Sequence, residues 1–115
     1  MNKEVQPASK LEGTLSLPPD KSISHRAAMF ASLHDGESII RNYSAAADPQ
    51  STLSCMRQLG VEIEQQGSTV LVKGNGREGL KQPASDLDCG NSGTTMRLLS
   101  GIVGGAGIHC PLTGD

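Results

Sequence analysis

Apolar residues recur at the spacing of an α-helix in three separate stretches of the chain. The first stretch covers about residues 22–34 and follows an alternating run at 13–17, which is typical of a short strand. Two prolines separate the strand from the helix. The face of this helix that we expect to be buried carries Ile23, Ala27, Phe30 and Ala31.

The second predicted helix has the clearest start signal. It follows a strand-like run at 37–42, and we expect Asp48 as its N-cap and Pro49 as its first residue. A proline fits there because the first N–H groups of a helix have no partner within it. Gly60 marks the end of the helix. Its predicted buried face consists of Thr52, Cys55, Met56 and Leu59.

The rest of the chain predicts more strands and one more helix. Two alternating runs at 61–65 and 69–73 indicate a β-hairpin, in which Glu62 and Glu64 face water. A strand, a helix and a strand are then expected at about 85–89, 92–103 and 107–112. The apolar face of this last helix carries Thr95, Leu98, Leu99 and Ile102.

The predicted order of elements is therefore β-α-β-α-β-β, followed by β-α-β. This order indicates an α/β chain of repeated units (an α+β repeat), whose second unit stops before its second helix. Repeat units bury their apolar faces against one another, so an incomplete unit needs further chain beside it. We therefore expect these 115 residues to be a fragment of a larger protein.

Charge and cysteine content narrow the possible function classes. The net charge is −2 with both signs spread along the chain, which argues against a nucleic-acid or membrane surface. The polar N-terminus and the short apolar runs predict neither a signal peptide nor a membrane span. Three cysteines without CxxC spacing predict reduced thiols in a cytoplasmic protein, and no metal site. Cys55 and Cys110 are expected in the core, whereas Cys89 is a candidate for reaction with thiol reagents.

Two short segments share one arrangement at a constant offset of 71 residues: Asp20–Arg26 and Asn91–Arg97. Each opens with a side chain that can cap a helix, continues with small hydroxyl residues, and places an arginine about a turn and a half later. Helix N-termini carry unpaired N–H groups and the positive end of the helix dipole. Two such ends with added hydroxyls and guanidinium groups predict binding of a ligand, or a ligand pair, with several anionic groups.

The residues alone leave a simpler interpretation open. Side chains at such positions often act only as helix caps, which would apply to Asp20, Ser22 and Asn91. The cations would then be solvated surface groups, namely Lys21, Arg26 and Arg97. Gly93 would be only a tight turn, and His25 is expected on the surface of the first helix.

Extended to Leu17–Ala27 and Asp88–Arg97, the two segments resemble the signature motifs of the EPSP synthase (3-phosphoshikimate 1-carboxyvinyltransferase) family. The resemblance implies a two-lobed enzyme. Each lobe would be an inside-out barrel of three βαβαββ units, with the helices inside a ring of sheets. Residues 1–12 would cross between the lobes and 13–115 would belong to the first lobe. One unit would occupy about 13–74, and the next would start at about 85–115.

The resemblance also implies a reaction and its ligands. The family transfers the enolpyruvyl (carboxyvinyl) group of phosphoenolpyruvate to the 5-hydroxyl of shikimate 3-phosphate and releases phosphate, on the shikimate pathway to chorismate and the aromatic amino acids. The resemblance also implies a cytoplasmic monomer that needs no cofactor or metal and binds no nucleic acid or membrane. Glyphosate would inhibit this enzyme. The acid and base residues expected from the second lobe are absent here, so this chain alone is expected to be inactive.

Transferred position by position, the family's ligand residues fall in the two segments. Lys21 would be the catalytic residue and would touch both substrates. Ser22 and Arg26 would bind shikimate 3-phosphate together with Lys21. Phosphoenolpyruvate would be contacted by Lys21 and by Asn91, Gly93, Thr94 and Arg97. Asp48 would face the cleft between the lobes in a structural role.

Two departures from the family pattern and two alternative functions stay open. Pro19 stands where the family commonly has glycine, and Asp48 follows three alanines where many relatives have further acidic residues. A sister enolpyruvyl transferase that acts on UDP-N-acetylglucosamine shares the fold, but its first motif is different. A non-catalytic anion-binding module is the second alternative.

Overall fold

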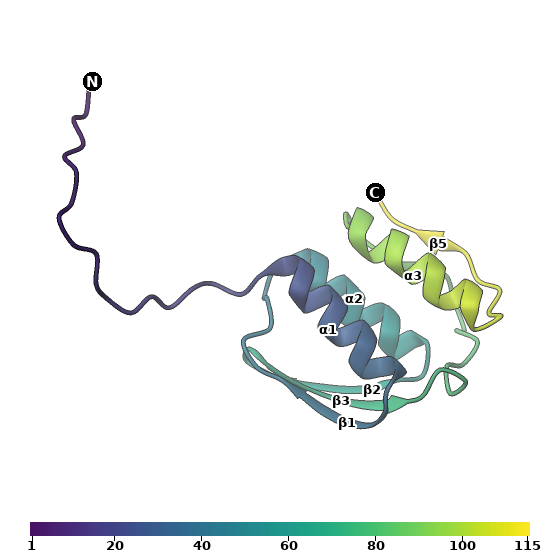
Figure 1. The fold of residues 1–115 in the computed structure, drawn as a ribbon. Helices are drawn as coiled ribbons and strands as arrows, with labels where there is room; N and C mark the ends of the chain where they lie inside the picture. The colour runs from purple at the N-terminus through teal and green to yellow at the C-terminus, as the bar shows by residue number, and fades with distance from the viewer.

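The computed structural model describes residues 1–115. Residues 1–20 form no helix or strand and run outward from the folded part (Figure 1). The remaining residues form, in order, α1 (Lys21–Leu33), β1 (Asp35–Ile40), α2 (Ala47–Gln58), β2 (Glu62–Gln66), β3 (Thr69–Asn75), β4 (Leu87–Asp88), α3 (Gly93–Gly105) and β5 (Leu112–Thr113).

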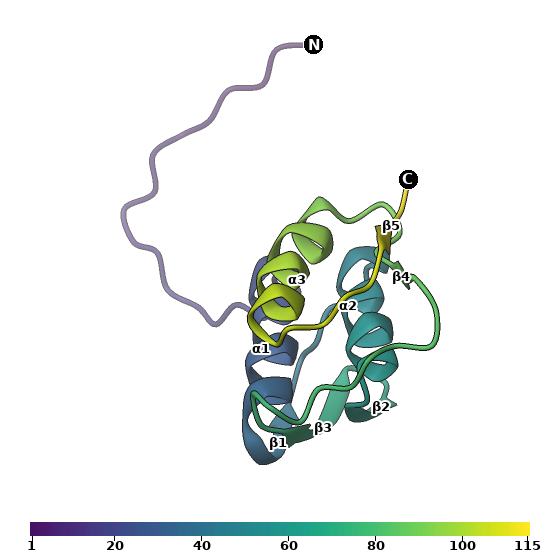
Figure 2. The ribbon, with the colours of Figure 1, turned by 90° about the vertical axis from the view of Figure 1, so that its right-hand side faces the viewer.

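The folded part has three layers (Figure 1). An antiparallel sheet of order β1-β3-β2 is covered on one face by α1 and α2. Beyond these two helices, away from the sheet, lie α3 and the short parallel pair β4–β5. The three helices run side by side with their N-terminal ends on the same side of the molecule (Figure 2). Any site formed by helix N-termini is therefore shared between elements far apart in sequence.

The core lies between the sheet and the helices. Val70 and Val72 of β3 point into it from alternate positions of the strand, and Leu53 and Met56 of α2 meet them from the helical layer. Gly74 lets β3 pass very close to the end of α1, because a Cβ there would lie 2.0 Å from the carbonyl oxygen of His34. The sheet therefore fixes the position of α1.

Several predictions about the elements are confirmed. The hairpin at 61–65 and 69–73 corresponds to β2 and β3, and the side chains of Glu62 and Glu64 are exposed. The third helix lies within two residues of its predicted bounds. The predicted face of α2 is buried at all four positions: Thr52, Cys55, Met56 and Leu59.

The strand predicted at 13–17 is absent. These residues are exposed and extended, and no backbone hydrogen bond joins them to the rest of the chain. An alternating pattern favours a strand only where a partner strand satisfies its N–H and C=O groups. The strand predicted at 85–89 is shortened for the same reason, and the one predicted at 107–112 is wrong except at Leu112. Only Leu87–Asp88 and Leu112–Thr113 pair with each other.

The predicted buried face of α1 is wrong at two of its four positions, and the predicted start of α2 is wrong. Ala31 is buried and Ala27 is half-buried, but Ile23 and Phe30 are exposed. The buried residues of α1 are mostly small or polar: Ser24, His25, Ala28, Met29, Ala31 and Ser32. Helix α2 begins at Ala47, with Ala46 as N-cap, so Asp48 and Pro49 are its second and third residues. Proline is tolerated throughout a first turn, so it does not identify the first residue. In α3, Leu98 of the predicted face is exposed.

Candidate functional site

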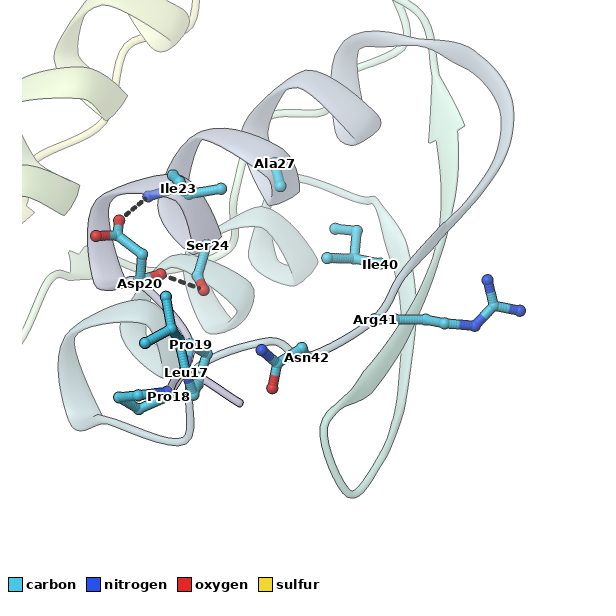
Figure 3. A pocket seen from close by; sticks show the side chains of 10 residues that line it. All are labelled: Leu17, Pro18, Pro19, Asp20, Ile23, Ser24, Ala27, Ile40, Arg41 and Asn42. Carbon is cyan, nitrogen blue, oxygen red and sulfur yellow. Dashed lines mark hydrogen bonds between the residues drawn. The ribbon is translucent and has the colours of Figure 1, made fainter. Parts of the chain in front are cut away.

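The N-terminus of α1 presents Lys21 and Ser22 to solvent. Asp20 caps the helix, as predicted: its Oδ1 accepts a hydrogen bond from the backbone N–H of Ile23 at 2.7 Å. The Ser24 hydroxyl turns back and donates to the Asp20 carbonyl at 2.7 Å (Figure 3). Because the cap is supplied by a residue before the helix, the side chains of Lys21 and Ser22 remain available to a ligand.

A pocket of about 240 Å³ lies beside this helix end, but it is not the predicted anion site. Its lining is Leu17, Pro18, Pro19, Asp20, Ile23, Ser24, Ala27, Ile40, Arg41 and Asn42 (Figure 3). None of the predicted ligand residues is among them. Asp20 adds a carboxylate, which disfavours a second anion there. We therefore look for the anion site on the exposed side of the helix end.

The N-terminus of α3 is capped by Ser92, not by Asn91. The backbone N–H of Thr95 donates to the Ser92 Oγ at 3.1 Å, and Asn91 lies exposed in the preceding turn. The two caps are therefore 72 residues apart, whereas the sequence motifs align at 71. Arg26 and Arg97 consequently differ by one residue in their distance from the cap, which rotates them by about 100° around their helices.

The other α3 residues of the predicted site lie close to the helix end. Gly93 is exposed as the first helical residue, and Thr94 beside it is half-buried. The Arg97 Nε donates to the Gly93 carbonyl at 3.1 Å, and its guanidinium folds back over Gly93. A Cβ on Gly93 would lie 3.0 Å from the Arg97 Nη2, so glycine makes room for this guanidinium.

Asp48 brings the N-terminus of α2 to that of α1. Its Oδ2 lies 3.5 Å from the Lys21 Nζ, with 59 % of the lysine side chain and 35 % of the aspartate side chain exposed. Such a half-exposed ion pair adds little stability, but it orients the ammonium group. The carboxylate also lies in the first turn of α2, where the helix dipole favours negative charge.

A buried chain of hydrogen bonds joins all three helix ends, and the sequence analysis missed it. His25 of α1 bonds through its Nδ1 to the Thr52 Oγ1 of α2 at 2.6 Å, and this hydroxyl bonds to the Thr95 Oγ1 of α3 at 2.9 Å. The Thr95 Oγ1 in turn lies 2.8 Å from the Ser92 Oγ. We call these four residues, His25, Thr52, Thr95 and Ser92, the buried polar chain.

The prediction that His25 lies on the helix surface is wrong, since only 2 % of its area is exposed. Burial lowers its pKa below 6.5, because a charged imidazole is poorly solvated there; Asp48 raises the pKa and Lys21 lowers it by smaller amounts. The sequence feature that could have revealed a buried polar partner such as His25 is the presence of two threonines, Thr52 and Thr95, on the predicted apolar faces of α2 and α3. A buried hydroxyl requires a polar partner.

Comparison with known proteins now adds to the geometry. The family model for EPSP synthase (3-phosphoshikimate 1-carboxyvinyltransferase) matches residues 5–115. This chain belongs to the EPSP synthase family. It is 50% identical to the 3-phosphoshikimate 1-carboxyvinyltransferase of Solibacter usitatus over 115 residues, which are 100% of the chain and 27% of the relative. It is 53% identical to that of Thermodesulfovibrio yellowstonii over 116 residues, which are again 100% and 27%.

Solved structures of the EPSP synthase family support the same assignment. Two structures of EPSP synthase from Acinetobacter baumannii match 90% of the chain, with TM-scores of 0.78 and 0.84 and identities of 39% and 41%. The match covers 24% and 23% of those chains. The present chain thus spans about a quarter of the length of its relatives, and it has the mixed α/β fold of the corresponding part of EPSP synthase.

The cysteines take no part in this helix-end site. Cys55 and Cys89 are fully buried and Cys110 is half-buried, and all three are free thiols. The Cys55 Sγ donates to the Asp88 carbonyl at 3.2 Å, and burial raises its pKa to about 12. Cys89 is fully buried, and burial raises its pKa, which disfavours the reactive thiolate; its reaction with thiol reagents stays a prediction.

The structure contains neither a metal-binding group of side chains nor a membrane-spanning helix. No group of three or more histidine, cysteine, aspartate or glutamate side chains is arranged to hold a metal ion. None of the three helices has the length and apolar character needed to cross a membrane.

Proposed function

We propose that this chain forms part of an enzyme that transfers the enolpyruvyl group of phosphoenolpyruvate to the 5-hydroxyl of shikimate 3-phosphate and releases phosphate. The observation that carries the proposal is the meeting of two exposed, capped helix N-termini, those of α1 and α3, within a fold of the EPSP synthase family. Both helix ends offer free N–H groups to anions, and both carry an arginine and hydroxyl side chains. Two anionic substrates fit this arrangement.

In this proposal Lys21 is the catalytic residue and contacts both substrates. Its ammonium is at the positive end of α1 and is oriented by the Asp48 carboxylate of α2, 3.5 Å away, which supports a role at the shared helix-end site. A cation there stabilises the negative charge that accumulates as phosphate departs. Ser22 and Arg26 bind shikimate 3-phosphate, since a hydroxyl and a guanidinium can both donate to phosphate or carboxylate oxygens.

The N-terminus of α3 forms the phosphoenolpyruvate side of the site. Gly93 lets the Arg97 guanidinium lie against the helix end, where both would contact phosphoenolpyruvate. Thr94 and Asn91 provide further hydrogen-bond donors. The bond from Arg97 to the Gly93 carbonyl supports this arrangement, because it holds the guanidinium near the helix end. Glyphosate would occupy the same space.

We also propose the family's larger architecture for the whole protein: two inside-out barrel lobes in a monomer that needs no cofactor. One βαβαββ unit would end near residue 74 and the next would begin near 85. The extended course of residues 1–12 supports a segment that crosses between lobes. The three free thiols support a cytoplasmic location.

The test is phosphate release by the full-length protein, by which we mean this chain extended to the length of its relatives. Release should require both phosphoenolpyruvate and shikimate 3-phosphate. Lys21→Met should lower kcat/KM at least about 100-fold, because the charge at the reacting centre is lost. Lys73→Met is the matched control, since Lys73 also forms an ion pair, with Glu62 at 2.8 Å, but lies on β3.

The alternatives give different results in this assay. Release of phosphate with UDP-N-acetylglucosamine in place of shikimate 3-phosphate would favour the sister transferase, which the relatives' names do not support. Binding of both anions without turnover would favour a non-catalytic module. Equal rates for Lys21→Met and Lys73→Met would remove Lys21 from the mechanism.

A further inference from the structure

The buried polar chain is the direct link between the two groups of predicted ligand residues. It contains one residue of α1, one of α2 and two associated with α3, so each helix N-terminus contributes. The Thr95 hydroxyl also donates to the Asp48 carbonyl at 3.4 Å, which adds a second bond to α2. No buried side-chain nitrogen or oxygen in the structure lacks a hydrogen-bond partner. The helix ends are therefore held by specific, satisfied bonds.

Apolar packing between α1 and α3 is incomplete. Met29 of α1 and Leu99 of α3 belong to one core cluster, but a groove of about 200 Å³ also lies between the two helices. The groove is lined by Arg26, Met29, Phe30, Leu33, Leu98 and Ile102. Phe30 and Leu98, the large side chains that could fill it, are exposed. The spacing of α1 and α3 at the site thus depends on bonds made near their N-termini.

Three of the four members of the buried polar chain, all except Thr52, are adjacent in sequence to predicted ligand residues. None of the four is itself a predicted ligand residue. His25 precedes Arg26 and lies one turn after Lys21. Thr95 follows Thr94, and Ser92 lies between Asn91 and Gly93. A shift of His25 relative to Thr95 would change the distance between the two ligand groups without removing a ligand contact.

We propose that His25 is a positioning residue, which fixes the N-terminus of α1 relative to that of α3. Its Nδ1 makes a short hydrogen bond to Thr52, which bonds onward to Thr95, and a longer direct one of 3.5 Å to the Thr95 Oγ1. The proposal rests on the proposed function, in which phosphoenolpyruvate is contacted from both helix ends and shikimate 3-phosphate from α1 alone. Loss of these hydrogen bonds should therefore impair the use of phosphoenolpyruvate more than the binding of shikimate 3-phosphate, because only phosphoenolpyruvate is contacted by both α1 and α3.

The test is steady-state kinetics of full-length variants. Thr52→Val replaces the central hydroxyl with a methyl group of similar shape, and His25→Leu removes the imidazole. Both should lower kcat/KM for phosphoenolpyruvate about tenfold or more, because small displacements of reacting groups are costly. The KM for shikimate 3-phosphate should stay within about twofold, because its contacts move together with α1.

Two controls separate positioning from stability. Ser32→Ala removes an equally buried hydroxyl of α1, which donates to the Ala28 carbonyl at 2.7 Å, and should lower the thermal midpoint without changing either substrate's kinetics. His25→Asn puts an amide group near the position of the Nδ1 atom and should restore most of the activity lost in His25→Leu. Thr52→Ser, which keeps the hydroxyl, should behave like the wild type even if the larger changes impair folding.

The outcomes distinguish the two proposals. A wild-type protein without turnover would overturn the proposed function, and the positioning role with it. An active wild type whose folded Thr52→Val and His25→Leu variants keep their kcat/KM for phosphoenolpyruvate would overturn the positioning role alone. A KM for shikimate 3-phosphate that rises about tenfold in both variants, or failure of His25→Asn to restore activity, would also contradict it.

Discussion

Among single residues, His25 has the most unusual surroundings. Its imidazole is buried, and its pKa lies below 6.5 because the charged form is poorly solvated, with Asp48 and Lys21 acting in opposite directions. Between the folded-state pKa and 6.5 the unfolded chain binds more protons than the folded one. Protonation of His25 therefore favours unfolding, and its contribution to stability should be lost as the pH falls below 6.5.

We expect the thermal midpoint of the protein to fall more steeply below pH 6.5 in the wild type than in His25→Asn, which has no titrating group at this position. Melting curves followed by circular dichroism between pH 7.5 and 5 would measure the difference. Parallel curves for the two proteins would show that His25 titrates as freely in the folded state as in the unfolded one.

The sequence predicted the exposed members of the site but not the buried ones that support them. Lys21 and Ser22 are recognisable because they follow a capping aspartate and have the residue types that anions require. Thr52 and Thr95 were assigned to apolar faces because their spacing fits, and spacing does not show that two hydroxyls will meet. Their partnership depends on a contact between residues 43 positions apart.

At the scale of elements, α1 shows why burial is harder to predict than helicity. Its length is correct within a residue, because periodicity and the Asp20 cap are local signals. Its buried face is predicted only in part: Ala31 is buried, but α1 packs closely on the sheet through small residues such as Ala28 and leaves Phe30 exposed. The β2–β3 hairpin was predicted more accurately, since one face of an alternating strand is apolar and the other is charged.

The contact between α1 and β3 gives a stability prediction at this scale. In Gly74→Ala the new methyl group would lie 2.0 Å and 2.3 Å from the carbonyl oxygens of His34 and Ala31, which are backbone atoms and cannot rotate away. The helix and the strand would have to separate, at a cost of about 3 kcal/mol in the free energy of unfolding.

Urea unfolding followed by circular dichroism would measure this cost. Gly101→Ala in α3 is the matched control, because its Cβ would meet no atom within 4 Å and alanine favours a helix by about 1 kcal/mol. A Gly74→Ala protein as stable as this control would show that α1 is not held against β3 as tightly as the structure indicates.

Considered as a whole molecule, the chain presents its predicted ligand groups on an open surface. Lys21, Ser22, Arg26 and Arg97 are all exposed, so water screens their charges and weakens any stabilisation of a transition state. We expect the isolated chain to release phosphate at least about 1,000-fold more slowly than the full-length protein. Rates within tenfold of each other would mean that residues 1–115 already contain the groups that perform the chemistry.

The extended residues 1–20 also have a consequence for biosynthesis. Leu11, Leu15 and Leu17 are exposed and make no hydrogen-bonded strand with residues 21–115. If their partner lies in a part of the protein that is translated after residues 1–115, the leucines stay uncovered until that part is made. At about 5–20 residues per second, each further 100 residues take about 5–20 s. A nascent chain of this kind is a natural client for a chaperone that binds short apolar segments near the ribosomal exit.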